Sequence, residues 1–317
     1  MNASISLDLD NQWAYMKVHG DAGWEKYPTY LDRFLPHGLE MLKKYNLKIT
    51  FFIVGRDADD ERNSGTISEI TKYGHEVGNH SYNHEASFNF YNREEILDEL
   101  NKTEAAIEKI TGALPIGFRG PGFSQSKLLF QILKEKNYLY DASTLPTWIG
   151  PFARTYYFRQ SNLTKEERKT REGLFGSFSD GFKTIKPFKW NLGNNSHLLE
   201  IPVSTIPILK VPFHFSYLHY LAKVSVGLMN SYLQTAISLC KITNTEPSFL
   251  LHPLDLIGGD LIPELNFFPG MDLSSSYKAE LFDIVMEKMT SNFNLVCMSE
   301  HANQILERKN LPVKIAI

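Results

Sequence analysis

The stretch KITFFIVGRDADDERNSGTISEITKYGHEVGNHSYNH, Lys48–His84, contains one complete strand–helix–strand unit. Its first eight residues form an apolar run that is typical of a buried strand. Residues 67–74 predict a short helix that ends at Gly74, and residues 75–80 predict a second short strand. A helix that joins two strands in this way returns the chain to the start of the sheet, so the pattern predicts parallel strands.

The same alternation extends to both ends of the chain. Further strands are predicted at residues 4–10, 116–122, 138–143, 198–204, 248–253 and 295–300. Long amphipathic helices are predicted at residues 30–46, 92–112, 126–137 and 277–292. Seven or eight such units favour a (β/α) barrel over an open sheet. Residues 148–195 interrupt the alternation, and we interpret them as an insertion over the barrel mouth within a single domain of residues 1–317.

The composition indicates a soluble globular protein. Of the 317 residues, 43% are hydrophobic and 22% are charged, and the net charge of −3 gives no electrostatic footprint for nucleic acid. The two cysteines form no metal or disulfide framework. The N-terminal residues do not resemble a signal peptide, and the most apolar run is a poor membrane span. We therefore expect a cytoplasmic protein that makes at most peripheral contact with a membrane.

Polar side chains gather where the predicted strands end. Because the carboxyl ends of all strands in a barrel meet at one mouth, residues far apart in the sequence are expected to converge there. The set is Asp8, Asp10, His80, Arg119, Asp141 and His252. A packed core gives no reason for this placement, so we take the set as the candidate site.

A pair of histidines, one of them in this set, suggests a metal site. His80 and His84 lie four residues apart after a strand, so both rings can reach one ion if the segment turns helically. Asp8 or Asp10 is the candidate third ligand, and both point to the same face of a strand. Two imidazoles and one carboxylate suit zinc or a similar divalent ion and leave positions open for water and substrate.

The remaining groups fit hydrolysis of an amide or an ester. The aspartate of the Asp8/Asp10 pair that binds no metal can act as the base that activates water. His252 can protonate the leaving nitrogen, and Asp141 is a candidate for the carboxylate that holds this histidine. Arg119 can hold the base by a charge-assisted hydrogen bond. A buried structural ion pair is the alternative reading of Arg119.

Five ordered segments resemble the motifs of the polysaccharide deacetylase superfamily, the NodB-homology or carbohydrate esterase family 4 group. They are SLDLDNQW (residues 6–13), HSYNH (80–84), FRGPGF (118–123), YDASTLP (140–146) and FLLHP (249–253). The resemblance implies a distorted (β/α)7 barrel and metal-dependent removal of an N-acetyl or formyl group from an amino sugar. By position it implies Asp10, His80 and His84 as metal ligands, Asp8 as base, Arg119 as its partner, His252 as acid and Asp141 as the carboxylate behind His252.

The first motif departs from the usual pattern, since Leu9 separates two aspartates that are commonly adjacent. This Asp-x-Asp spacing resembles a subgroup that spans sugars and small amides, and it leaves the division of labour between Asp8 and Asp10 open. The substrate expected is an N-acylated sugar of a polysaccharide, glycolipid or glycan precursor. An allantoinase-like small-amide hydrolase and a non-catalytic carbohydrate-binding protein are the alternatives.

Residues 206–229 raise a membrane hypothesis. This segment contains Phe213, Phe215, Tyr217, Tyr220 and Leu221 among sparse lysines. Part of it could touch a membrane or a lipid tail. The alternative is a barrel helix with one apolar face.

Overall fold

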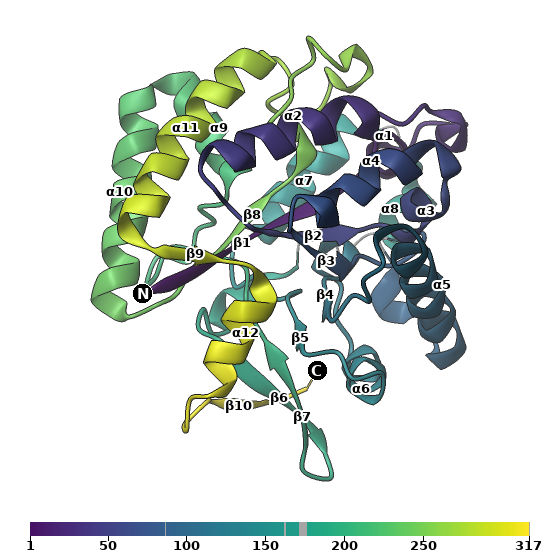
Figure 1. Ribbon diagram of the computed structural model, residues 1–317, viewed down its shortest axis with the longest axis vertical. Coiled ribbons are helices and arrows are strands. Elements are labelled where there is room, and N and C mark those ends of the chain that lie inside the picture. The colour runs from purple at the N-terminus through teal and green to yellow at the C-terminus, as the bar shows by residue number, and fades with distance from the viewer. Residues whose placement is uncertain (86, 162, 171–175, 317) are drawn as a thin grey trace.

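The computed structural model describes residues 1–85, 87–161, 163–170 and 176–316. Seven parallel strands run side by side in the order β8-β1-β2-β3-β4-β5-β7 (Figure 1). They are β1 (Asn2–Leu9), β2 (Thr50–Ile53), β3 (Glu76–Asn79), β4 (Gly117–Phe118), β5 (Tyr140–Asp141), β7 (Ser196–Glu200) and β8 (Ser248–Leu251). The predicted parallel sheet of a distorted (β/α)7 barrel is thereby confirmed.

Among the described residues, no ladder of strand pairing closes the barrel between β7 and β8. The chain after β7 approaches β8 instead, where the backbone N–H of Ser204 donates to the carbonyl of Ser248 at 3.0 Å. The hydroxyl of Ser204 donates to the same carbonyl at 2.8 Å. The seam is thus held by isolated hydrogen bonds.

Three further strands extend the sheet outside this set. β6 (Phe188–Gly193) pairs antiparallel with β7, and β10 (Val313–Ile315) pairs with β6 at the edge. β9 (Asn294–Val296) pairs with the first residues of β1. The C-terminal strand therefore ends beside the β6–β7 hairpin (Figure 1).

Helices cover the sheet between successive strands. They are α1 (Gln12–His19), α2 (Leu31–Lys44), α3 (Gly55–Asp59), α4 (Glu61–Lys72), α5 (Arg93–Thr111), α6 (Lys127–Glu135), α9 (Phe215–Val224), α10 (Val226–Thr243), α11 (Ser275–Asn292) and α12 (Met298–Leu306). Helix α5 begins at the capping box formed by Asn92 and Glu95, which fixes its first turn. Its buried face includes Glu99, a charged residue among apolar neighbours.

The segment that interrupts the alternation contains α7 (Gly150–Gln160), α8 (Lys165–Thr170) and a short 3-10 helix at Phe178–Phe182. Residues 162 and 171–175 of the predicted insertion lie outside the described residues. The Lys183 ammonium donates to Gln125 Oε1 at 3.0 Å. The Lys210 ammonium donates to the carbonyls of Gly181 and Lys183 at 2.6 and 2.8 Å. These bonds attach the insertion to loops that follow β4 and β7, while the single-domain organisation stays a prediction.

Among the helices of the described residues, none combines the length and the apolar character needed to cross a membrane.

Candidate metal and catalytic site

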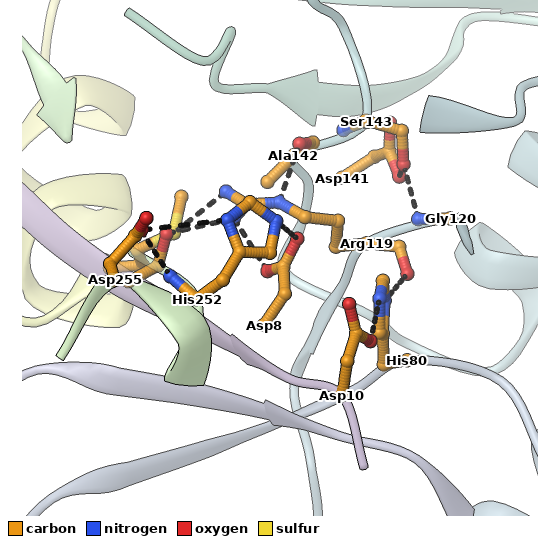
Figure 2. A network of polar contacts seen from close by, with 12 residues as sticks. Asp8, Asp10, His80, Arg119, Gly120, Asp141, Ala142, Ser143, His252 and Asp255 are labelled. Atoms are coloured by element: carbon orange, nitrogen blue, oxygen red, sulfur yellow. Dashed lines mark hydrogen bonds and ion pairs between the residues drawn. The ribbon is translucent and has the colours of Figure 1, made fainter. Parts of the chain in front are cut away.

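The site lies where β1, β3, β4 and β8 end. Asp8 is the penultimate residue of β1 and Asp10 follows that strand, while His80 follows β3. Arg119 follows β4 and His252 follows β8. Figure 2 shows these side chains pointing toward one another from separate strands. The convergence expected from their places in the sequence is therefore present for these five residues.

Three side chains form a compact group that can hold a cation. The Oδ1 atom of Asp10 lies 3.1 Å from His84 Nε2 and 3.6 Å from His80 Nε2. One ligand atom from each residue lies within 4.8 Å of the other two. The opposite nitrogen of His80, Nδ1, is bonded to the carbonyl of Arg119 at 2.7 Å, which makes it the protonated nitrogen and leaves Nε2 free to bind an ion.

The chemistry of this group fits a divalent metal ion. Asp10 Oδ1 is buried and accepts no hydrogen bond from the described residues, although burial of such an oxygen without a partner is costly. Burial lowers the pKa of His80, which favours the neutral imidazole that metal binding needs. The set of two nitrogens and one oxygen suits zinc or a similar ion.

Asp8 belongs to a different set of contacts. Its Oδ1 accepts a hydrogen bond from Arg119 Nη1 at 2.8 Å, and its Oδ2 lies 4.0 Å from His252 Nε2. Arg119 is fully buried and also donates to Ser6 Oγ at 2.9 Å and to the carbonyl of Ala142 at 3.0 Å. A guanidinium held at three points fixes the Asp8 carboxylate in turn. The expected contact between Arg119 and an aspartate is thus present, and the aspartate is Asp8.

The prediction that Asp141 stands behind His252 is wrong. Asp141 accepts hydrogen bonds from the hydroxyl and the backbone N–H of Ser143, at 2.7 and 3.1 Å. Among the described residues, the carboxylates within 4.0 Å of the His252 ring nitrogens belong to Asp8 and Asp255. The physical reason is local, because Asp141 is bonded to Ser143 in its own loop, whereas the turn after β8 folds Asp255 back onto His252.

Asp141 instead forms a buried pair with Glu200, the last residue of β7. Both residues are fully buried, and burial raises the pKa of each carboxyl group. Glu200 accepts hydrogen bonds from the backbone N–H of Thr144 at 2.9 Å and from Trp190 Nε1 at 2.8 Å. The pair therefore holds the loop after β5 in place. The hydroxyl of Ser143 in this loop accepts a hydrogen bond from the Gly120 N–H at 2.8 Å and so also fixes the loop after β4.

Asp255 is a site residue that the sequence reasoning missed. Its Oδ2 accepts a hydrogen bond from the backbone N–H of His252 at 2.8 Å and lies 3.7 Å from Nδ1 of the same residue (Figure 2). His252 precedes the 3-10 turn Pro253–Asp255, which ends at Asp255 and folds this aspartate back onto the histidine. The spacing His-Pro-Leu-Asp after a strand was the available signal.

These carboxylates decide the charge of His252. Burial lowers the pKa of His252, but hydrogen bonding to Asp255 and the charges of Asp255 and Asp8 outweigh it and raise the pKa to about 9. Burial raises the pKa of Asp255, and His252 reverses this and lowers it to about 2. At neutral pH the pair is therefore an imidazolium beside a carboxylate, so His252 is ready to donate a proton.

Comparisons with known proteins find similarity to polysaccharide deacetylases. A family model described as polysaccharide deacetylase matches residues 21–140. The uncharacterized protein YlxY of Bacillus subtilis is 36% identical over 107 residues, which is 34% of this chain and 31% of that protein. A peptidoglycan-N-acetylglucosamine deacetylase of Bacillus cereus is 32% identical over 137 residues, which is 42% of this chain and 58% of that protein.

Among solved structures, a putative polysaccharide deacetylase from Mycobacterium smegmatis has the same fold. Its TM-score is 0.63 at 18% sequence identity, over 99% of this chain and 93% of that one. The matches to the two Bacillus proteins span 31% and 58% of their lengths, so less than two thirds of each relative is represented. Residues 21–140 of this chain thus resemble polysaccharide deacetylases, both by the family model and by sequence identity to the Bacillus cereus enzyme.

Proposed function

We propose that this protein is a metal-dependent hydrolase that removes an N-acetyl or formyl group from an amino sugar. The substrate would be part of a polysaccharide, a glycolipid or a glycan precursor. The observation that carries the proposal is the group Asp10–His80–His84 directly beside the Asp8–Arg119 pair and His252. A cation site, a fixed carboxylate and a charged histidine are what hydrolysis of an amide requires.

Zinc is the ion that we propose for this group, and a bound ion of this kind would polarise the amide carbonyl and activate water. Asp8 would accept the proton that the attacking water loses. Arg119 occupies Asp8 Oδ1, so the proton would go to Oδ2, the atom that faces His252. His252 would give its own proton to the leaving nitrogen, so that the free amine and the carboxylic acid are the products.

The contacts support a different role for each of the two aspartates. Asp10 faces both imidazoles and accepts no hydrogen bond at Oδ1, as expected of a ligand. Asp8 faces a guanidinium and the histidine acid, as expected of a base. We therefore assign metal binding to Asp10 and proton transfer to Asp8.

The proposal is tested by acetate and formate release from a panel of N-acyl amino sugars, with and without a chelator. We expect release that stops with chelator, returns with added zinc and is absent in His80→Ala. The matched control is His197→Ala, a histidine of the β6–β7 hairpin outside the site. Release that persists with chelator contradicts the mechanism. Release from small amides such as allantoin but from no sugar favours the small-amide alternative.

A lipid-linked sugar is a substrate that this protein would meet at a membrane. Phe213 and Phe215, which suggested lipid contact in the sequence, are buried and belong to the core. The contact that we propose uses the insertion patch, defined by six exposed apolar residues, of which the last two belong to residues 206–229: Trp148, Phe152, Phe178, Phe182, Ile208 and Leu209.

Contacts connect parts of the insertion patch, and four of its six residues lie in a basic segment. The rings of Phe152 and Phe178 are 5.7 Å apart, and the Lys210 ammonium joins the loop of Leu209 to Gly181. Residues 148–190 contain nine lysines and arginines against four aspartates and glutamates, in a chain whose net charge is −3. Exposed phenylalanines among basic residues suit an anionic lipid surface.

Flotation with liposomes tests this contact. We expect the protein to float with vesicles that contain phosphatidylglycerol, and less with neutral vesicles or at high salt. The double variant Phe152→Ser/Phe182→Ser should stay in the soluble fraction. The variant Phe90→Ser, at an exposed phenylalanine outside the insertion, should float like the wild type. A wild-type protein that does not float contradicts the contact. Cytoplasmic localisation stays a prediction, which cell fractionation tests.

A further inference from the structure

The loop between the two histidines of the metal group has an unusual backbone. His80 follows β3, and the chain must turn within four residues to bring His84 to the same Asp10 oxygen. Ser81 and His84 adopt positive φ angles of 61° and 49°, a region that residues other than glycine rarely occupy. Such a conformation persists only where surrounding contacts determine it.

Glu99 supplies the central contacts of this loop from helix α5. Its Oε2 accepts hydrogen bonds from the backbone N–H groups of Tyr82 and Asn83, at 2.7 and 2.9 Å. Its Oε1 accepts a third from Asn83 Nδ2 at 2.6 Å. The side chain is almost completely buried, at 4% exposure for the residue, so its negative charge is directed at these three donors.

Other elements hold the carbonyl groups of the same loop. The backbone N–H of Gly55 donates to the carbonyl of Ser81 at 2.9 Å, and that of Arg56 donates to the carbonyl of Tyr82 at 3.1 Å. The Lys17 ammonium donates to the carbonyl of Asn83 at 2.9 Å. Cations and amides thus hold the carbonyls while the Glu99 carboxylate holds the N–H groups.

Gly55 is required for this arrangement to close. A Cβ atom at this position would lie 2.4 Å from Thr103 Oγ1 on α5 and 2.7 Å from Cδ2 of Tyr82. The start of α3 therefore packs directly against both α5 and the loop, as the adjacent positions of α3 and α5 in Figure 1 illustrate. The loop is enclosed between two helices and has little freedom to adopt another shape.

We propose that Glu99 is a positioning residue of the metal site, which presets the loop so that His80 and His84 reach one ion. The inference rests on the proposed metal dependence and names the residue that organises its two histidine ligands. Without the carboxylate, Tyr82 and Asn83 lose their acceptor and the positive φ angles lose their main support. The free energy needed to order the loop would then reduce the free energy of metal binding, so the metal affinity would fall.

The substitution Glu99→Gln tests this role. Glutamine presents one oxygen and one NH2 group, so in either orientation its NH2 faces a donor that the carboxylate accepted. We expect the affinity of the metal-free protein for Co²⁺ to fall about 10- to 100-fold, the range seen when groups that orient metal ligands are removed. The visible absorption of the Co²⁺ complex should change too, because it reports the ligand geometry. Metal-free unfolding should remain a single cooperative transition, which shows that the variant is folded.

Glu108→Gln is the matched control, since Glu108 lies on the same helix and is exposed. It should leave both the Co²⁺ affinity and the spectrum unchanged. If Glu99→Gln does not fold, Asn83→Ala, which removes only the contact to Oε1, should still weaken Co²⁺ binding. A folded Glu99→Gln with wild-type affinity and spectrum overturns the inference alone. A wild-type protein that binds no Co²⁺ overturns the proposed metal dependence instead.

Discussion

Asp255 contacts His252 at two points, with its Oδ2 atom 2.8 Å from the backbone nitrogen and 3.7 Å from the ring nitrogen Nδ1. The backbone contact holds the carboxylate in place, and the ring contact stabilises the imidazolium. This is the role that the sequence assigned to Asp141. The pair explains why a histidine at the barrel mouth is charged at neutral pH, and it leads to two predictions about pH.

The activity of the wild-type protein should decline on the alkaline side near pH 9. His252 must be protonated to act as the acid, and its pKa is raised to about 9, so the active form is lost as the pH rises through that value. The measurement is kcat/KM for sugar deacylation between pH 6 and 11. A His252→Gln variant should have only residual activity, and that activity should lack this alkaline limb. An alkaline limb near the ordinary histidine value of about 6.5 contradicts the prediction.

Asp255→Asn should move the alkaline limb to lower pH by about one unit or more. The amide removes the negative charge that favours the imidazolium. The effect of burial, which lowers the pKa of His252, is then no longer offset by Asp255. The pH profile of kcat/KM measures the shift, which a purely structural role would not produce. Asp98→Asn, at an exposed aspartate on α5, is the control and should keep the wild-type profile.

Asp8→Asn and Asp10→Asn should fail in different ways. Asp8→Asn should bind metal with nearly wild-type stoichiometry and lose deacylation by about 100-fold or more, because it lacks the base. Asp10→Asn should lose metal affinity first, because it lacks a ligand. Metal content after gel filtration, measured beside activity, separates the two. The reverse pattern would exchange the roles of the two aspartates.

Arg119→Met should destabilise the protein by about 3–5 kcal/mol, because it leaves the buried Asp8 charge without its partner. It also removes the donors to Ser6 and to the Ala142 carbonyl. Urea unfolding followed by tryptophan fluorescence measures the change. Arg93→Met removes an exposed pair with Glu135 and should cost less than about 1 kcal/mol. Equal losses of unfolding free energy in the two variants would show that the buried pair stabilises the protein no more than the exposed pair does.

Much of the fold and most of the site could be read from the chain. Apolar runs that alternate with amphipathic segments predict the parallel strands, since burial on both faces demands such runs. His80 and His84 stand out because a short strand precedes them and their spacing suits one ion. Asp8 and Asp10 stand out because they end the first strand.

The wrong and missed residues share a cause. Asp141 ends a strand like the other candidate site residues, but its carboxylate is bonded within its own loop, to Ser143. Asp255 follows a strand by several residues, and only the turn returns it to His252. Glu99 resembles an ordinary charge of a solvated helix face, and only the packing of α5 against the loop after β3 shows that it is buried.

The sequence by itself determined the class of fold and indicated the candidate metal ligands and the candidate acid, because periodicity and spacing are local properties of a chain. The tertiary structure alone decided which oxygen meets which nitrogen: Asp8 with Arg119, Asp10 with the two histidines, and Asp255 with His252. Pairing of charges depends on distances of a few ångströms between groups brought together from separate strands. Those distances are set by strand order and by turns, which spacing along the chain does not encode.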